Sequence, residues 1–349
     1  MTAPTVPGGV DRKRWLRQLI VGMVMLPLSI LPFLAYFHFT QEGRLLWAEF
    51  RLAVSKPHLP QLPPDELQWI QAHTPSYEGS VALLVYHGIG PSADDDGRFA
   101  IPPEVFAEQL ATLKAAGMHT VTAREVAQAF SGHGTLPQNA VMISFDDGRT
   151  DAMMYADPLL EEAGMRATMF VITHAAEDPG IYYVGWDKLR KYAADGRWDL
   201  ESHSANSHHE QWVGPPGTDN WLPALTSLLP RETIDEYTDR VYGDLRVASQ
   251  TIGDEIGERP VAFAYPFGAH GTERTNDPQI QDLLRGAVST NYSIAFDQDD
   301  QSTWGLATCR DDPYSLRRLE IGQWSGRTLL LRIDQAATRL GDGRSDERC

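Results

Sequence analysis

Short runs of apolar residues alternate along the chain with longer stretches in which apolar residues recur at helical spacing. The short runs, which contain β-branched residues, are typical of buried strands, and the longer stretches are typical of amphipathic helices. We expect strands at 81–86, 140–145, 168–173, 198–201, 261–265 and 292–296, and helices at 102–116, 122–130, 152–164, 187–194, 232–252 and 326–340. This order predicts an α/β fold in which crossover helices connect a parallel sheet that is closed, or nearly closed, into a barrel.

Polar side chains stand where several of these strands end. His87 follows the first strand, Asp146 and Asp147 follow the run 140–145, His203 follows the run 198–201, and Tyr265 ends another strand. In barrels of parallel strands, the chemistry is carried at the carboxyl ends of the strands. We therefore expect these side chains, although far apart in sequence, to meet at one mouth of the barrel.

Two adjacent carboxylates, Asp146 and Asp147, precede Gly148 at the end of the run 140–145. Neighbouring like charges raise one another's pKa unless a cation separates them. Glycine permits a turn, so the two side chains are able to do different work. A bound metal would take one Asp as a ligand and leave the other free to act as a base. An exposed Asp-Asp-Gly turn without chemistry is the alternative interpretation.

Three of the chain's eleven histidines, His203, His208 and His209, fall within seven residues. Imidazole nitrogens and a carboxylate oxygen form a suitable ligand set for zinc, and three protein ligands leave one position open for water. Residues five apart are separated by about 140° on a helix, so His203 and His208 would share a metal only from a strand end and a loop. Asp147 is available as the third ligand. His209 is the rival of His208, and a polar loop without any ligand is the alternative.

The N-terminal region has a different character. Residues 19–39 lack Asp, Glu, Lys and Arg, and 21 such residues are enough to span a bilayer as one helix. Basic residues are denser before this stretch than after it, which predicts a cytoplasmic N-terminus and an extracytoplasmic catalytic domain. A cleaved signal peptide is the alternative, but the apolar run is long for one. The expected organisation is a cytoplasmic segment at 1–18, a transmembrane anchor at 19–39, a stem at 40–79 and a catalytic domain at 80–349.

Composition narrows the range of partners. The formal net charge of −17 argues against nucleic acid, because phosphate binding requires basic patches. The hydrophobic content of 42% is normal for a globular protein with a core. The two cysteines, Cys309 and Cys349, are too few for a disulfide scaffold or a cysteine-rich zinc site, and whether they pair is left open.

Two motifs together resemble the polysaccharide deacetylase family, which is also called the NodB homology domain or carbohydrate esterase family 4. The first is Phe145-Asp146-Asp147-Gly148, and the second is Ser202-His203-Ser204 with another histidine shortly after it. The resemblance covers about residues 80–340. It implies a distorted (β/α) barrel and an N-acetylated glycan as the substrate.

The resemblance also implies roles for individual residues. Asp146 corresponds to the family's catalytic base, whereas Asp147, His203 and His208 correspond to its metal ligands. The implied cofactor is a divalent metal, with zinc expected and cobalt, nickel or iron as alternatives. The backbone N–H of Phe267 corresponds to the donor that stabilises the oxyanion.

The chain departs from the common family pattern in several places. The common form spaces the two histidines by four residues, and the spacing of five here resembles the branch that acts on poly-β-1,6-N-acetylglucosamine. Ala264 replaces the arginine that steadies the base, for which Arg317 or Arg318 is a substitute. Leu319-Glu320-Ile321-Gly322 lacks the histidine that is the usual general acid. In the resembling branch the acid comes from an early Tyr-His pair, which implies His87 here.

Aromatic side chains beside these positions are candidates for binding sugar rings. We expect Tyr265, Phe267 and Trp212 to line a glycan groove, although aromatic residues more often belong to a core. Whether the insertion at 211–231 covers such a groove is left open.

The sequence therefore predicts a membrane-anchored, metal-dependent N-deacetylase that faces outward and acts on a cell-surface amino-sugar polysaccharide. Peptidoglycan is the alternative substrate. A metal-dependent glycosyltransferase and a non-catalytic glycan-binding module are the alternatives from other classes. The expected partners are the glycan and the membrane, and the sequence identifies no glycan-synthase partner.

Overall fold

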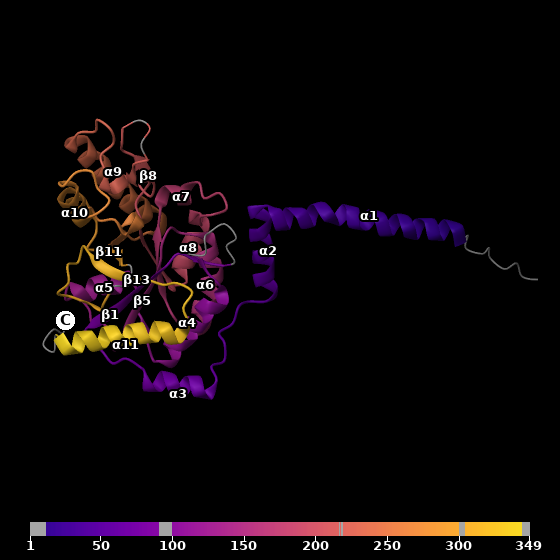
Figure 1. Ribbon diagram of the computed structural model, residues 1–349, viewed down its shortest axis with the longest axis horizontal. Helices are drawn as coiled ribbons and strands as arrows, with labels where there is room; N and C mark the ends of the chain where they lie inside the picture. The colour runs from indigo at the N-terminus through magenta and orange to yellow at the C-terminus, as the bar shows by residue number, and fades with distance from the viewer. Residues whose placement is uncertain (1–11, 91–99, 216, 218, 300–303, 344–349) are drawn as a thin grey trace, which may run out of the picture. The chain divides into compact units, whose positions relative to one another are not determined.

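The computed structural model describes residues 12–90, 100–215, 217, 219–299 and 304–343. The chain divides into two units, Met1–Ser55 and Lys56–Cys349, and Figure 1 shows the elements of each. The first unit contains helices α1 (Arg12–Phe39) and α2 (Gln41–Val54). Among the described residues, no helix combines the length and the apolar character that a membrane crossing needs, so the predicted span at 19–39 is not confirmed.

Seven parallel strands of the second unit close into a barrel. Going round the barrel, each strand pairs with the next, and the last pairs with the first. The order is β1 (Ser80–Tyr86), β13 (Leu316–Glu320), β11 (Ile294–Asp299), β10 (Ala262–Ala264), β7 (Trp198–Ser202), β6 (Ala167–Val171) and β5 (Ala140–Phe145). The predicted parallel (β/α) barrel is thus confirmed. Two short strands extend the sheet, β12 (Ala307–Thr308) antiparallel to β1 and β4 (His119–Thr120) parallel to β5.

Alternating side chains of each strand divide between two apolar layers, because successive residues of a strand point to opposite faces. One cluster draws buried residues from six barrel strands, among them Leu83, Met142, Phe170 and Phe296, and therefore fills the interior. The other residues of β1, such as Leu84, pack with buried residues of the surrounding helices. The strands are buried on both faces, as a parallel sheet requires.

Helix α5 (Ala123–Phe130) closes the amino-terminal end of the barrel. Its residues Ala123 and Val126 belong to the interior cluster, and Thr122 forms a capping box with Glu125. Because this helix fills the amino-terminal end of the barrel interior, a site inside the barrel is expected at the carboxyl ends of the strands.

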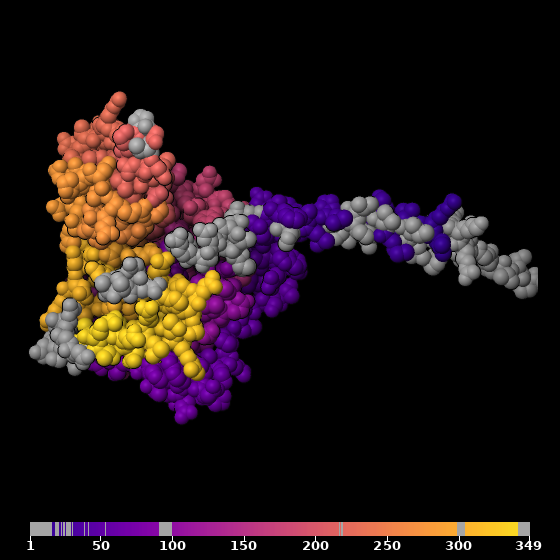
Figure 2. Space-filling model, viewed as in Figure 1, coloured from indigo at the N-terminus to yellow at the C-terminus, as the bar shows by residue number. Residues whose placement is uncertain are grey.

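Helices surround the barrel on the outside (Figure 1). They are α3 (Pro64–Ala72), α4 (Pro103–Ala115), α6 (Thr150–Ala163), α7 (Thr173–Glu177), α8 (Trp186–Ala194), α9 (Ile234–Ile256), α10 (Ile280–Asn291) and α11 (Gly326–Gly343). The short elements are β2 (Gly88–Ile89), β3 (Ala100–Ile101), β8 (Glu210–Trp212), β9 (Trp221–Pro223), η1 (Ala224–Thr226) and η2 (Pro266–Gly268). In the space-filling view, α11 (yellow) and the segment from β8 to α10 (salmon to orange) form separate parts of the surface (Figure 2).

Several of these elements lie outside the expectations from the sequence. Helix α10 was not predicted, and the stretch 40–79, expected as a stem, contains α2 and α3. Within α3, Ile70 is fully buried in the apolar layer around the barrel, and Glu66 pairs with Arg327 of α11. Residues from Lys56 onward accordingly belong to the barrel unit.

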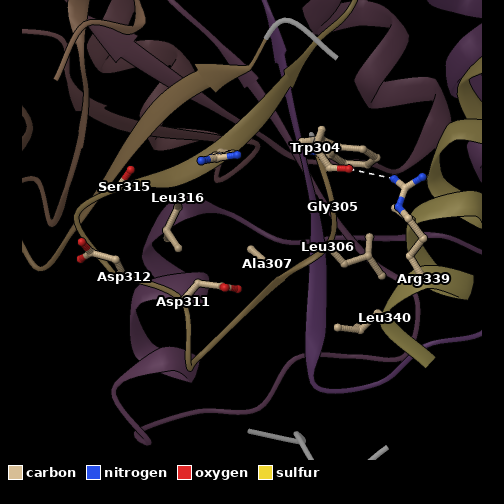
Figure 3. Close-up of a pocket in the computed structure, with 12 residues that line it drawn as sticks. Trp304, Gly305, Leu306, Ala307, Asp311, Asp312, Ser315, Leu316, Arg339 and Leu340 are labelled. Atoms are coloured by element: carbon tan, nitrogen blue, oxygen red, sulfur yellow. Dashed lines mark hydrogen bonds between the residues drawn. The ribbon is translucent and has the colours of Figure 1, made fainter. Parts of the chain in front are cut away.

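A cavity of about 540 Å³ lies beside α11 (Figure 3). It is lined by residues from 304–317 and by Ala336, Arg339 and Leu340. Ala307 of its lining pairs with Val81 at the start of β1, so this cavity lies towards the amino ends of the strands. Cys309 nearby is disulfide-bonded, and the other cysteine of the sequence, Cys349, lies outside the described residues.

Candidate functional site

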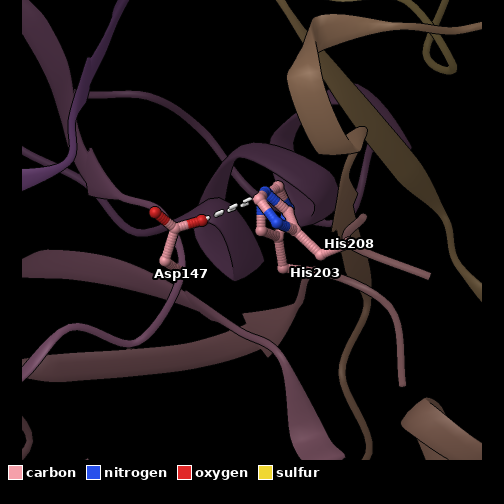
Figure 4. Close-up of side chains that lie close together, drawn as sticks. All are labelled: Asp147, His203 and His208. Carbon is pink, nitrogen blue, oxygen red and sulfur yellow. Dashed lines mark ion pairs between the residues drawn. The ribbon is translucent and has the colours of Figure 1, made fainter. Parts of the chain in front are cut away.

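Three side chains that are distant in sequence meet at the carboxyl ends of the strands. Asp147 follows β5, His203 follows β7, and His208 lies in the loop after β7. The Nε2 atoms of His203 and His208 lie 3.5 Å and 3.2 Å from Oδ1 of Asp147 (Figure 4). One potential ligand atom from each of the three residues lies within 4.8 Å of the others. The structure thus brings together the three residues that the sequence suggested as ligands.

The donor set of this cluster fits a divalent cation such as zinc. Nδ1 of His203 lies 2.8 Å from the carbonyl oxygen of Ala264. Because a carbonyl only accepts, Nδ1 carries the hydrogen, so Nε2 is the atom that can present a lone pair to a cation that replaces its proton. Oδ1 of Asp147 is buried without a hydrogen-bond partner, although it faces both imidazoles. A buried carboxylate oxygen facing two imidazole nitrogens is satisfied by a shared cation.

Burial and neighbouring charges set the protonation of these groups. Burial, followed by the charge of His203, lowers the pKa of His208 to about 4, so this ring is neutral at pH 7. Burial would raise the pKa of Asp147, but the nearby imidazoles of His203, His208 and His87 lower it below its ordinary value. The site therefore offers an ionised carboxylate and a neutral imidazole at physiological pH.

Asp146 is held in a different direction from Asp147. Asp147 has a φ of 74°, and Gly148 also has a φ of 74°. This left-handed turn separates the two neighbouring carboxylates. Asp146 faces Arg318, whose Nη1 and Nη2 lie 2.6 Å and 2.8 Å from its two carboxylate oxygens. The pair is bidentate, and Arg318 is fully buried.

The guanidinium of Arg318 keeps Asp146 ionised. Burial alone would raise the pKa of Asp146, but the charge of Arg318, with those of His203 and His87, lowers it below its ordinary value. Of the two arginines suggested as substitutes at Ala264, Arg318 is the one that faces Asp146. Arg317, the next residue along β13, points to the opposite face and lines the cavity beside α11.

The loop between the two histidines is fixed through its backbone. Asp244 of α9 accepts hydrogen bonds from the N–H groups of Ala205 and Asn206, both at 2.9 Å. From the other side, the N–H groups of Thr173 and His174 donate to the carbonyls of Ser204 and Ala205, at 3.2 Å and 3.0 Å. These four bonds determine the position of His208. Asp244 was not predicted from the sequence, because no local sequence pattern marks it.

His209, the rival ligand, lies outside the cluster. Its Nδ1 is 3.0 Å from the carbonyl oxygen of Asn206, and the residue is exposed. His87, at the end of β1, is partly buried and close enough to lower the pKa of both Asp146 and Asp147. The preceding Tyr86 is buried, and its hydroxyl donates to Gln109.

The expected groove residues have different surroundings. Phe267 has a φ of 60°, is 39% exposed and stacks on His208, with 4.7 Å between the ring centroids. Tyr265 is only 2% exposed, and its hydroxyl donates to the carbonyl of Tyr314. In contrast to the expectation, the Tyr265 side chain belongs to the core, because it packs in a buried cluster with Phe263 and Tyr292. Trp212 is partly exposed in β8, opposite Trp221 of β9.

The family model named polysaccharide deacetylase matches residues 133–280. The chain carries a polysaccharide deacetylase domain. The matched segment includes Asp146, Asp147, His203 and His208, whereas His87 and Arg318 lie outside it.

A similar curated protein is the poly-β-1,6-N-acetyl-D-glucosamine N-deacetylase of Escherichia coli K12. It is 22% identical to this chain over 234 residues, which are 62% of this chain and 34% of the relative. The chain thus spans about a third of the length of the curated relative that it matches.

Solved structures of two deacetylases share the fold. A de-N-acetylase from Aggregatibacter actinomycetemcomitans is 23% identical with a TM-score of 0.60, and the match covers 72% of this chain and all of that one (100%). The BpsB deacetylase domain from Bordetella bronchiseptica is 20% identical with a TM-score of 0.56, over 71% of this chain and 97% of that one.

Replacing Asp244 tests whether the loop backbone positions His208. In Asp244→Asn, one of the two N–H groups faces an amide N–H₂ instead of an oxygen, so the loop loses part of its support. We expect the affinity for Co²⁺ to fall about tenfold, as for other residues that orient metal ligands. Titration of the visible Co²⁺ spectrum measures this. Asp239→Asn, an exposed change on the same helix, is the control. Equal affinities of the two variants would contradict the role of Asp244.

Proposed function

We propose that this chain is a metal-dependent hydrolase that removes acetyl groups from an amino-sugar polysaccharide such as poly-β-1,6-N-acetylglucosamine. The polysaccharide deacetylase domain and the name of the E. coli relative support the proposal. The observation that carries it is the geometry of the aspartate pair. Asp146 is ionised and held by Arg318, while its neighbour Asp147 faces two imidazoles.

In this proposal Asp147, His203 and His208 hold the divalent metal. When bound there, the metal would polarise the acetyl carbonyl and lower the pKa of a water molecule. The two histidines are held in place before a metal binds. His203 is held by its hydrogen bond to the Ala264 carbonyl, and His208 is held by the hydrogen bonds between Asp244 and the backbone of its loop. Such preorganisation lowers the cost of reaching the reactive arrangement.

Asp146 acts as the general base. It removes a proton from the attacking water, which requires an ionised carboxylate within hydrogen-bond reach. Arg318 contributes twice, because its charge keeps Asp146 ionised and its two N–H groups hold both carboxylate oxygens in one orientation. Arg318 is thus a positioning residue, and Asp146 is the catalytic one.

Two further groups complete the reaction. His87 donates a proton to the departing amine, a task suited to an imidazole because its ring nitrogens can both give and take protons. The backbone N–H of Phe267 donates to the oxygen that becomes negative as water adds to the carbonyl. Both assignments follow the family resemblance and the position of these residues at the carboxyl ends of β1 and β10.

We also propose that the domain is anchored in a membrane and works outside the cytoplasm. The uncharged run 19–39 and the basic residues before it support this placement. Protease treatment of intact spheroplasts should cut the barrel unit while sparing a tag at the N-terminus. Protection of the barrel unit would contradict the placement.

Acetate release tests the activity directly. The full chain loaded with Zn²⁺ should release acetate from β-1,6-linked N-acetylglucosamine oligomers, and a chelator should abolish the release until Zn²⁺ is restored. Asp146→Asn should lower kcat/KM about 10²–10⁴-fold, the usual contribution of a general base, while the variant still binds Co²⁺. β-1,4-Linked oligomers and peptidoglycan fragments, tested in parallel, distinguish the substrates. A metal-loaded chain that releases no acetate from any of them would contradict the proposal and favour a glycosyltransferase or a binding module.

The pH dependence of the rate tests Arg318. In Arg318→Met, burial is no longer opposed by the guanidinium, so the pKa of Asp146 rises. Because Asp146 must be ionised, the acidic limb of the kcat/KM profile should move to higher pH. The free energy of unfolding should fall by about 3–5 kcal/mol, since the carboxylate stays buried without its partner.

The sign of the stability effect follows from the lowered pKa. Wild-type Asp146 stabilises the fold above its unfolded pKa, and this contribution is lost as the pH falls through the lower folded value. Arg317→Met, on the opposite face of β13, is the control for both measurements. If the acidic limb of the kcat/KM profile is unchanged in Arg318→Met, Arg318 does not set the pKa of Asp146 and its role is only structural.

A further inference from the structure

The two imidazoles of the candidate site are oriented by different means. His203 is oriented by a hydrogen bond from its ring to the Ala264 carbonyl. For His208, the described part of the chain provides no such bond from another residue to Nδ1. Its ring instead stacks on Phe267 at an interplanar angle of 27°. Whatever holds Phe267 therefore helps to orient His208.

Phe267 is itself in contact with a cation. The guanidinium carbon of Arg274 lies 5.6 Å from the centroid of the Phe267 ring, within the range of a cation–π interaction. Both residues have unusual backbone conformations, with φ of 60° at Phe267 and 52° at Arg274. Non-glycine residues keep such conformations only where their surroundings hold them.

The surroundings of Arg274 belong to the insertion after His208. The guanidinium forms an ion pair with Glu210 at the start of β8. The carbonyl of Arg274 accepts a hydrogen bond of 2.8 Å from the hydroxyl of Thr226, which is fully buried in η1. Asn276, two residues further on, exchanges two hydrogen bonds with the backbone of Leu228. The loop 266–276 is thus tied to the insertion at several points.

These contacts connect His208 to its own chain segment. His208 stacks on Phe267, Phe267 contacts Arg274, and Arg274 pairs with Glu210. Glu210 lies only two residues after His208 along the chain. At the base of the insertion, the N–H of Ala224 donates to the carbonyl of His209 at 3.0 Å. A displacement of the hairpin formed by β8 and β9 would therefore move the stack as well as the loop.

We propose that Arg274 and Glu210 are a positioning pair that holds Phe267 against His208 and keeps Nε2 of His208 directed at Asp147. The pair gives the β8–β9 insertion a function in building the metal site. This inference rests on the proposed metal centre. In this inference the ring of Phe267 orients the imidazole of His208, as the hydrogen bond to Ala264 orients that of His203.

The experiment measures metal affinity rather than activity. Arg274→Ala removes the cation and the ion pair from the stack without touching a ligand. We expect the dissociation constant for Co²⁺, from titration of its visible absorption, to rise about tenfold, in the range typical of residues that orient metal ligands. The Co²⁺ spectrum should also change in shape, because the direction of one imidazole changes. Arg274→Lys retains a cation over the ring and should recover part of the affinity, and Glu210→Gln should lose part of it.

Arg285→Ala is the matched control. Arg285 also pairs with a carboxylate, that of Asp312, and lies 5.1 Å over an aromatic ring, that of Tyr314. Its side chain is 45% exposed, compared with 42% for Arg274, but its partners, Asp312 and the ring of Tyr314, are neither Phe267 nor one of the three proposed ligands. Arg285→Ala should therefore bind Co²⁺ as the wild type does. Thermal unfolding of the metal-free variants checks that all of them fold.

The outcomes separate this inference from the proposed function. Wild-type affinity and spectrum in Arg274→Ala would overturn the positioning pair and leave the proposed deacetylase intact. Equal losses in Arg274→Ala and Arg285→Ala would also overturn it, because the effect would then be general. A wild-type chain that binds no Co²⁺ would overturn both the metal centre and the pair.

Discussion

The buried ion pair between Arg318 and Asp146 is the interaction on which the rest of the site depends. Removing two charges from water costs several kcal/mol per ion, and their attraction offsets this only where the geometry is good and the other polar groups have partners. Here the pair is bidentate, Nη1 of Arg318 also donates to the Ser144 hydroxyl, and Nε donates to the Asp297 carbonyl. The guanidinium also lies over the ring of Phe170. The barrel interior therefore contains the Arg318–Asp146 ion pair at its carboxyl end and apolar residues in the remainder.

This pair also connects the two ends of the domain. Asp146 stands after β5, whereas Arg318 stands on β13, the last strand, which is inserted between β1 and β11. The segment 133–280, which matches the family model, contains Asp146, Asp147, His203 and His208 but ends before β13. Closing the barrel with the last strand is thus a requirement of the proposed chemistry as well as of the fold. A chain that ended after α10 would keep its motifs and lose the partner of Asp146.

Much of this arrangement is predictable from the sequence because it depends on local signals. The alternation of apolar runs and amphipathic stretches predicts the parallel barrel, and the position of Asp147 and His203 after strands predicts that they meet. The choice between Arg317 and Arg318 required the structure, because the register of β13 decides which of them faces inward. Asp244 was not predictable, since its two bonds join a helix to a loop 38 and 39 residues away. Tyr265 was misplaced for a related reason, because only packing distinguishes a buried aromatic from an exposed one.

The loop between His203 and His208 is held entirely by peptide groups of residues 204–206, with Asp244 on one side and the start of α7 on the other. No side chain of those three residues takes part in these four bonds. Ser204 has a φ of 79° and is fully buried, and Ala205 is buried as well. Backbone conformation and steric fit, rather than polar contacts of the side chains, therefore limit which residues can stand at these two positions.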